Sequence, residues 1–218
     1  MAIDISKTLG EAFEIVKNNL EIVGLYVIKL VVLAVVGLGL LGINFLTLKQ
    51  SPMLSVMIGQ MVYSFILFMI IAVFVQAIIT ASAIFIVASV KKKKKISISK
   101  ALELGIRKAP ILFVAGIVAG IITALGFVAL IIPGIYLLVR LILYQQACVL
   151  EGNLGIKKSW KLTKGHFWDI FVLLIVLAII AVVLSLIPYI GPLINALFIA
   201  PISITAWTLV YLKLKKEK

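Results

Sequence analysis

The amino-acid sequence predicts an all-α integral membrane helical bundle, with six transmembrane helices and three amphipathic helices at its cytoplasmic interface. Two observations predict this fold class. First, 64% of the 218 residues are hydrophobic and only 13% are charged, whereas soluble domains are about 45–50% apolar and about 25% charged. Second, the apolar residues form long runs, and basic residues gather between alternate runs. Because water cannot solvate this much apolar surface, lipid is expected to cover it.

Charged clusters and turn residues divide the chain into apolar runs that are each long enough to cross a bilayer, which takes about 17–25 helical residues. The run at 53–90 exceeds one crossing, so we expect it to tilt, to kink or to extend beyond the hydrocarbon. Two helices within it would instead place the C-terminus outside the cell. A turn is expected at Lys49-Gln50-Ser51-Pro52. The six runs are 20–48, 53–90, 109–132, 134–150, 167–187 and 193–212.

The basic residues predict the orientation of the chain in the cell membrane. With six helices, the lysine-rich segments at 91–108, 157–164 and 213–218 fall on one side, and only Lys49 falls on the other. Cytoplasmic loops carry such an excess of lysine and arginine. Both termini are therefore expected in the cytoplasm, and the lysine run at 91–95 is expected to be a solvated loop.

Three cytoplasmic segments, 3–18, 97–108 and 154–165, are expected to be amphipathic helices, because their apolar residues recur every three or four positions. In the third segment, Ile156 and Trp160 are expected opposite the basic side. Such helices lie in the headgroup layer and attract anionic lipids. The residues expected to contact lipid headgroups are Lys157, Lys158, Lys161 and Lys164.

Each amphipathic segment precedes two apolar runs whose outer turn contains proline. The single domain 1–218 therefore divides into candidate repeats at 1–90, 96–150 and 154–214. Internal duplication is common in membrane transport folds. A series of unrelated hairpins remains the alternative.

Two basic residues, Lys29 and Arg140, lie inside apolar runs. Charged residues at membrane depth usually face the protein interior, a polar cavity or another polar group, and they often have a function. Their alternative is to extend toward the headgroups. Polar side chains that could satisfy these cations complete the candidate site: Asn44, Gln60, Gln76, Gln145 and Gln146.

The sequence indicates no enzyme, metal or cofactor. His166 is the only histidine and Cys148 the only cysteine, which excludes metal sites built from several of either. Gly37, Gly39 and Gly42 have the spacing of a dinucleotide-binding loop, but they lie inside an apolar run instead of between a strand and a helix. The net charge of +13 has no accompanying nucleic-acid-reading motif, so lipids are the expected partners.

Within residues 130–172, the stretches PGIYLLVR, VLEG and KKSWKLTKGHFWDIF resemble the membrane domain attached to some glycerophosphodiester phosphodiesterases. Stand-alone, largely uncharacterised bacterial and archaeal integral membrane proteins share that domain. The resemblance implies no activity, because catalysis in the multidomain relatives belongs to a separate soluble domain that this chain lacks. It marks as signature positions Pro133, Gly134, Arg140, Ser159, Trp160, Gly165 and Trp168.

The leading functional hypothesis is a non-enzymatic membrane protein that forms a polar path or cavity for ions or small solutes. Buried cations in an apolar bundle and the candidate repeats favour it, and a homo-oligomer is compatible with it. The alternative is a lipid-binding scaffold that organises a partner at the cytoplasmic face, which the basic amphipathic segments favour.

Overall fold

The computed structural model describes residues 3–50 and 54–217, and every regular element in this part of the chain is helical. The helices are α1 (Ile5–Asn18), α2 (Leu20–Gln50), α3 (Leu54–Lys91), α4 (Ile98–Ala129), α5 (Ile131–Leu141), α6 (Tyr144–Glu151), α7 (Ile156–Thr163), α8 (Phe167–Ser185), α9 (Ile190–Ile194), the π-helix η1 (Asn195–Ile199) and α10 (Ala200–Lys216).

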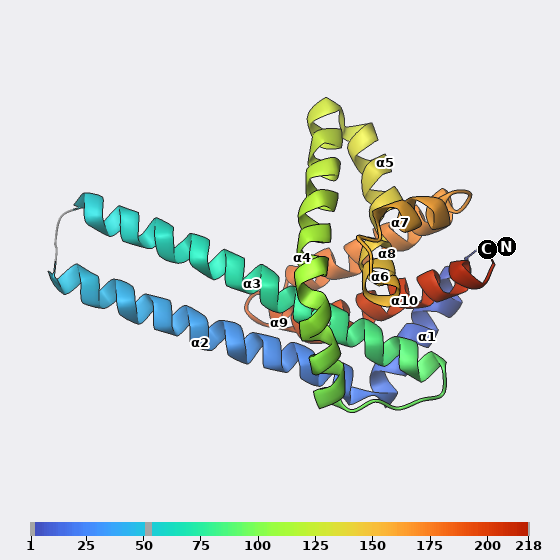
Figure 1. The fold of residues 1–218 in the computed structure, drawn as a ribbon, viewed down its shortest axis with the longest axis horizontal. Coiled ribbons are helices and arrows are strands. Elements are labelled where there is room, and N and C mark those ends of the chain that lie inside the picture. The colour runs from blue at the N-terminus through green and yellow to red at the C-terminus, as the bar shows by residue number, and fades with distance from the viewer. Residues whose placement is uncertain (1–2, 51–53, 218) are drawn as a thin grey trace.

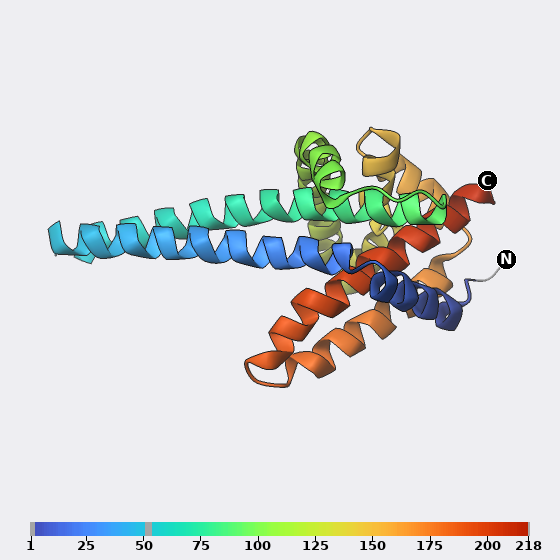
Figure 2. The ribbon, with the colours of Figure 1, turned by 90° about the horizontal axis from the view of Figure 1, so that it is seen from below.

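The helices form three hairpins that diverge from a shared base (Figure 1). α2 and α3 form the longest hairpin, α4 and α5 form the second, and α8 pairs with η1 and α10 in the third. Figure 2 shows the third hairpin pointing out of the plane of the other two. The helices therefore pack together at the base, where α1, α6 and α7 also lie, while the outer ends of the hairpins stand apart.

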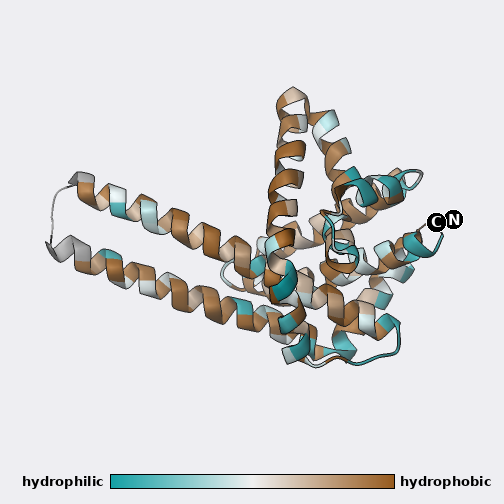
Figure 3. Ribbon diagram, in the orientation of Figure 1, coloured by the Kyte–Doolittle hydropathy of each residue, from teal (hydrophilic) through white to brown (hydrophobic). Residues whose placement is uncertain are grey.

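Six stretches within these helices are long and apolar enough to cross a membrane, which confirms the expected number of candidate spans. Apolar residues cover the outer parts of the hairpins, and hydrophilic residues concentrate at the base (Figure 3). Of the 18 most apolar consecutive residues of the α2 candidate span, only 17% are buried within the protein. Apolar surface exposed to this extent is compatible with a lipid environment.

The described part of the run at 53–90, which begins at Leu54, forms one continuous helix, α3, in place of the two-helix alternative. The turn expected between α2 and α3 falls partly on residues 51–53, which lie outside the described part of the chain. The bounds of the third and fourth apolar runs, 109–132 and 134–150, place the outer turn between α4 and α5 at Pro133, and this was wrong. Leu130 alone has an extended backbone there, and Pro133 occupies the first turn of α5, where its missing N–H would be unpaired in any case.

Two of the three expected amphipathic segments form separate helices, α1 and α7. Segment 97–108 does not, because α4 runs unbroken from Ile98 through the third apolar run. Pro110 lies inside α4 and removes only one backbone hydrogen bond, the one that the Ile106 carbonyl would accept. The second candidate repeat therefore has no separate amphipathic helix. The repeat organisation itself stays a prediction.

The fourth apolar run is interrupted, with α5 ending at Leu141 and α6 beginning at Tyr144. Gly152, which follows α6, has φ 81°, and Gly155, which precedes α7, has φ 73°. Both values lie in the left-handed region that glycine adopts readily. A Cβ at position 155 would also approach the Cys148 backbone nitrogen to 2.7 Å. These two glycines turn the chain so that α7 packs against α5.

Ionic contacts join the helices at the base. The Glu151 carboxylate accepts a hydrogen bond from Tyr211 (2.7 Å) and pairs with Lys215 (2.9 Å) and Lys158 (3.4 Å), which ties α6 to α7 and α10. Asp169 accepts from the backbone N–H of Ile3 at 3.0 Å, which fixes the start of the described chain against α8.

Candidate functional site

Two cavities lie around the point where the three hairpins meet. The larger, of about 450 Å³, lies between α2, α3, α6, α8, η1 and α10. The smaller, of about 330 Å³, lies between α3, α4 and α6. Three polar residues, Gln76, Thr80 and Gln145, line both. We call these two adjoining spaces the central cavities.

A hydrogen-bonded chain of polar side chains borders the central cavities. Lys29 Nζ donates to Gln76 Oε1 at 3.1 Å, and Gln76 Nε2 donates to Thr80 Oγ1 at 2.9 Å. Lys29 Nζ also lies 5.2 Å from the centre of the Tyr26 ring, close enough for a cation–π contact. The cation on α2 is therefore satisfied by an amide oxygen and an aromatic ring. Among the residues that the structure describes, no acidic residue lines either cavity.

Gln145 and Gln146 have different surroundings although they are neighbours on α6. Gln145 faces both central cavities and donates to the Tyr144 hydroxyl at 3.3 Å. Gln146 is 1% exposed, lines neither cavity, and among the described residues neither its amide nitrogen nor its oxygen has a hydrogen-bond partner. Buried amides almost always have partners, so Gln146 is an unusual feature of the core.

The sequence analysis missed Asn195, which lines the larger central cavity from the π-helix η1. Its Nδ2 donates to the Ala181 carbonyl at 2.8 Å and to Ser185 Oγ at 2.7 Å, while its buried Oδ1 has no partner in the described chain. Single π-helical turns are rare and often lie at functional sites. Nothing in the hydropathy of this apolar run signals the π-helix.

The structure places Arg140 in a different location from Lys29. Arg140 lines neither central cavity; instead its guanidinium lies 4.5 Å from the centre of the Trp160 ring on α7 and 5.8 Å from that of Tyr136. The residue is 5% exposed, and its buried Nε has no hydrogen-bond partner among the described residues. The two buried cations predicted from the sequence therefore lie in separate places.

The Ser159 side chain holds the backbone of Arg140 at the interruption between α5 and α6. Its hydroxyl accepts from the Leu143 backbone N–H at 3.2 Å and donates to the Arg140 carbonyl at 2.9 Å. Thr163, one turn further along α7, also donates to that carbonyl at 3.2 Å. Two side chains of α7 thus replace hydrogen bonds that an unbroken helix would make with its own backbone.

Aromatic side chains surround the Arg140–Trp160 contact. Tyr136 packs edge-on to Trp160 with 6.0 Å between ring centres and stacks on Phe167 at 5.5 Å. Trp168 and Phe171 extend the group along α8, each within 6 Å of Phe167. We call Tyr136, Trp160, Phe167, Trp168 and Phe171 the aromatic cluster; it contains two of the signature positions, Trp160 and Trp168.

Two signature glycines have backbone roles. A Cβ at Gly134 would collide with the Phe127 ring, and one at Gly126 would lie 3.0 Å from the Gly134 Cα. These glycines let α4 and α5 approach closely beside Leu130. Gly165 has φ 90° and connects α7 to α8.

The basic residues of α7 do not have the arrangement that we expected. Ser159, Leu162 and Thr163 form its buried side, whereas Trp160 is 39% exposed and shares the outer side with Lys157 and Lys161. The expectation that Trp160 lies opposite the lysines was therefore wrong. Lys164, which follows α7, is also exposed, and Lys158 pairs with Glu151.

Asn44 and Gln60 belong to the outer part of the first hairpin. Asn44 Oδ1 accepts from Ser64 Oγ at 2.9 Å, which joins α2 to α3 beside an apolar cavity of about 310 Å³. Gln60 is half-buried on α3. Neither residue lines the central cavities, so both are separate from Lys29 and Gln76.

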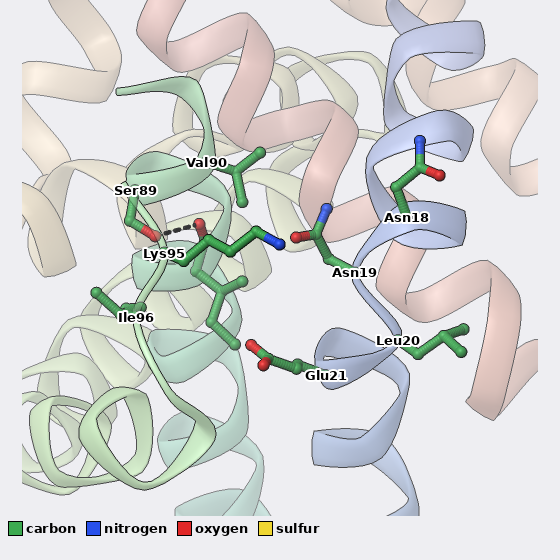
Figure 4. Close-up of a pocket in the computed structure, with 9 residues that line it drawn as sticks. Asn18, Asn19, Leu20, Glu21, Ser89, Val90, Lys95 and Ile96 are labelled. Atoms are coloured by element: carbon green, nitrogen blue, oxygen red, sulfur yellow. Dashed lines mark hydrogen bonds between the residues drawn. The ribbon is translucent and has the colours of Figure 1, made fainter. Parts of the chain in front are cut away.

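A fourth cavity of about 140 Å³ lies at the base between α1, α2, the end of α3 and the α3–α4 loop. Its polar lining includes Asn18, Asn19, Glu21 and Lys95. Figure 4 shows the Lys95 side chain extending from the loop toward Asn19. This cavity lies between the lysine-rich loop and the first helices, apart from the central cavities and the aromatic cluster.

Part of the chain matches a known protein family. Residues 100–210, just over half of the chain, match the model of a family described as a domain of unknown function (DUF7847). No curated protein and no solved structure matches the chain. The resemblance to the membrane domain of glycerophosphodiester phosphodiesterases stays a prediction, because the matched family's description names no activity.

Proposed function

This chain belongs to the DUF7847 family, and because that family's description names no activity, we propose a function from the geometry. We propose that the protein is a non-enzymatic, multi-pass membrane protein that admits a small polar solute or inorganic ion to its central cavities. The observation that carries this proposal is that both cavities share a wall of Gln76, Thr80 and Gln145, with Lys29 bonded to that wall.

In the proposed arrangement, the three hairpins cross the cell membrane and the base lies at its cytoplasmic side. The six apolar candidate spans support the crossings. The lysine-rich loop at 91–95 and the lysines near both chain ends lie at the base, which supports cytoplasmic termini by the positive-inside rule. α1 and α7 then lie at the membrane surface.

The charge around the central cavities favours an anion or an uncharged polar solute. Lys29 brings a positive charge to Gln76, and no carboxylate lines either space. Amide and hydroxyl groups can replace the hydration of such a solute. Because the outer ends of the hairpins stand apart, further copies of the chain are proposed to complete a continuous path.

Flux through proteoliposomes tests this proposal. The purified protein is reconstituted, and the release of chloride, nitrate, phosphate and glycerol is compared with that from protein-free vesicles. Gln76→Leu should abolish the protein-dependent flux, because it removes both the acceptor of Lys29 and the donor to Thr80. Gln60→Leu is the matched control, since it makes the same change away from the cavities, and it should leave flux unaltered.

The proposal fails if wild-type vesicles are as tight as empty ones for all four solutes. It also fails if Gln76→Leu and Gln60→Leu reduce flux equally, because the loss would then reflect general disturbance of the hairpin. Insertion and folding are verified for each variant by its helical circular dichroism and by monodisperse elution in detergent.

The exposed basic side of α7 favours one alternative function, a scaffold that holds a partner at the cytoplasmic face. Lys157, Lys161 and Lys164 are exposed on or next to this helix, and amphipathic basic helices bind anionic membrane surfaces. A scaffold would leave the vesicles tight while the protein still discriminates between anionic and zwitterionic lipids. Solute-selective leakage would instead support the path.

A further inference from the structure

The Arg140 guanidinium is a buried cation that lies outside the central cavities. It is 5% exposed, and its Nε has no hydrogen-bond partner in the described chain. No described carboxylate forms an ion pair with it. Arginine stays protonated in proteins, so the charge persists. Trp160, at 4.5 Å, supplies a cation–π contact, but an aromatic ring accepts no conventional hydrogen bond from the guanidinium edge.

Two carboxylates close to α7 along the chain, those of Glu151 and Asp169, already have other partners. Glu151 binds Tyr211, Lys215 and Lys158, and Asp169 binds the Ile3 backbone N–H. Neither pairs with Arg140, and we expect an acceptor from outside the chain to complete the hydrogen bonding of its Nε.

The surroundings of Arg140 select for phosphate. Spacings of three, one and three residues place four side chains on one side of α7 and of the residue that follows it. These are Lys157, Trp160, Lys161 and Lys164. All four are exposed. Guanidinium groups bind phosphate oxygens through two parallel hydrogen bonds, and tryptophan and tyrosine rings are enriched at the level of lipid headgroups. A buried arginine beside exposed lysines and aromatic rings matches a phosphate attached to an apolar group.

We propose that Arg140, Trp160 and the exposed lysines of α7 form a binding site for the phosphate of an anionic phospholipid. Arg140 holds the phosphate, the lysines attract the net charge of the headgroup, and the aromatic cluster contacts the glycerol and upper acyl region. The Ser159 and Thr163 bonds to the Arg140 carbonyl fix the Arg140 backbone against α7, and the Trp160 and Tyr136 rings contact the guanidinium, so the site is formed before the lipid arrives. This inference does not rest on the central cavities.

Lipid binding by the full chain in neutral detergent tests the inference. The dissociation constant for phosphatidylglycerol is measured by titration of tryptophan fluorescence, with phosphatidylcholine as the reference lipid. Arg140→Leu should weaken phosphatidylglycerol binding at least tenfold. Arg107→Leu is the matched control: it removes the same charge and fork from an exposed arginine that pairs with Glu103, and it should change binding less than twofold.

Arg140→Lys separates the guanidinium fork from the charge, and it should bind with intermediate affinity. The double substitution Lys157→Gln with Lys161→Gln alters only exposed side chains, so it tests the site even if Arg140→Leu does not fold; it should weaken binding severalfold. Inorganic phosphate and glycerol phosphate, added as competitors, identify the source of the phosphate. Competition at millimolar concentrations would assign a soluble phosphate ester to the site, and no competition would assign the lipid.

Two results would overturn the inference. One is equal weakening by Arg140→Leu and Arg107→Leu, which would mean that binding depends on net charge alone. The other is unchanged binding of phosphatidylglycerol and of both soluble phosphates by the double lysine variant. Unaltered solute flux in Arg140→Leu is expected, because the site is separate from the central cavities.

Discussion

Replacing Ser159 with alanine should destabilise the protein by about 1–3 kcal/mol, the usual cost of leaving one buried backbone donor unpaired. Ser159 is fully buried, and its hydroxyl is the acceptor for the Leu143 N–H. The Arg140 carbonyl also loses a donor, but it keeps the hydrogen bond from Thr163. The expected penalty therefore comes mainly from the Leu143 amide.

The free energy of unfolding can be measured in mixed micelles by titrating a denaturing detergent and following helical circular dichroism. Ser89→Ala is the control, because in the described chain the Ser89 hydroxyl donates to the Ile86 carbonyl within its own helix and accepts from no backbone N–H. Its effect should be about 0.5 kcal/mol or less. If Ser159→Ala and Ser89→Ala differ by less than about 0.5 kcal/mol, α7 does not satisfy the interruption between α5 and α6, and this reasoning fails.

Two further predictions address the helix crossing and the topology. Gly105→Ala should destabilise the protein by about 1–3 kcal/mol, because its Cβ would collide with the Ser82 hydroxyl where α3 crosses α4. The control, Gly120→Ala, meets nothing within 4 Å and should be tolerated. Equal stability of the two variants in the same titration would place the crossing elsewhere. With the native cysteine replaced, a cysteine at Lys93 should react with an impermeant thiol reagent only from the cytoplasm, and one at Tyr189 only from outside. Labelling of both from one side would contradict the proposed topology.

The sequence was sufficient to predict the all-helical class and the six candidate spans, because apolar run length reflects a constraint that each helix meets by itself. It did not predict the interruption after Leu141. No glycine or proline lies between α5 and α6, and the hydrogen bonds that permit the interruption come from Ser159 and Thr163 on a later helix. An interruption supported by a distant side chain leaves no local signal.

The candidate site was predicted in part. Lys29, Gln76 and Gln145 were identified as polar residues in apolar runs. The structure places Gln76 and Gln145 in the lining of the central cavities, and Lys29 is bonded to Gln76. Arg140 fulfils the same sequence criterion but lies beside Trp160. Hydropathy measures how apolar a segment is, and it contains no information about which hairpins meet or in which direction they diverge.

The contact between α1 and α10 joins two helices that are far apart along the chain. The apolar side of α1, formed by Ala12, Ile15 and Val16, also belongs to the cluster that contains Ile22 and Leu25 of α2. During translation, α2 and α3 can therefore cover part of this side early, whereas the surface that α10 provides follows only after the other hairpins have been synthesised. A chain that stops shortly before Ala200 would keep the first contacts and lose the second.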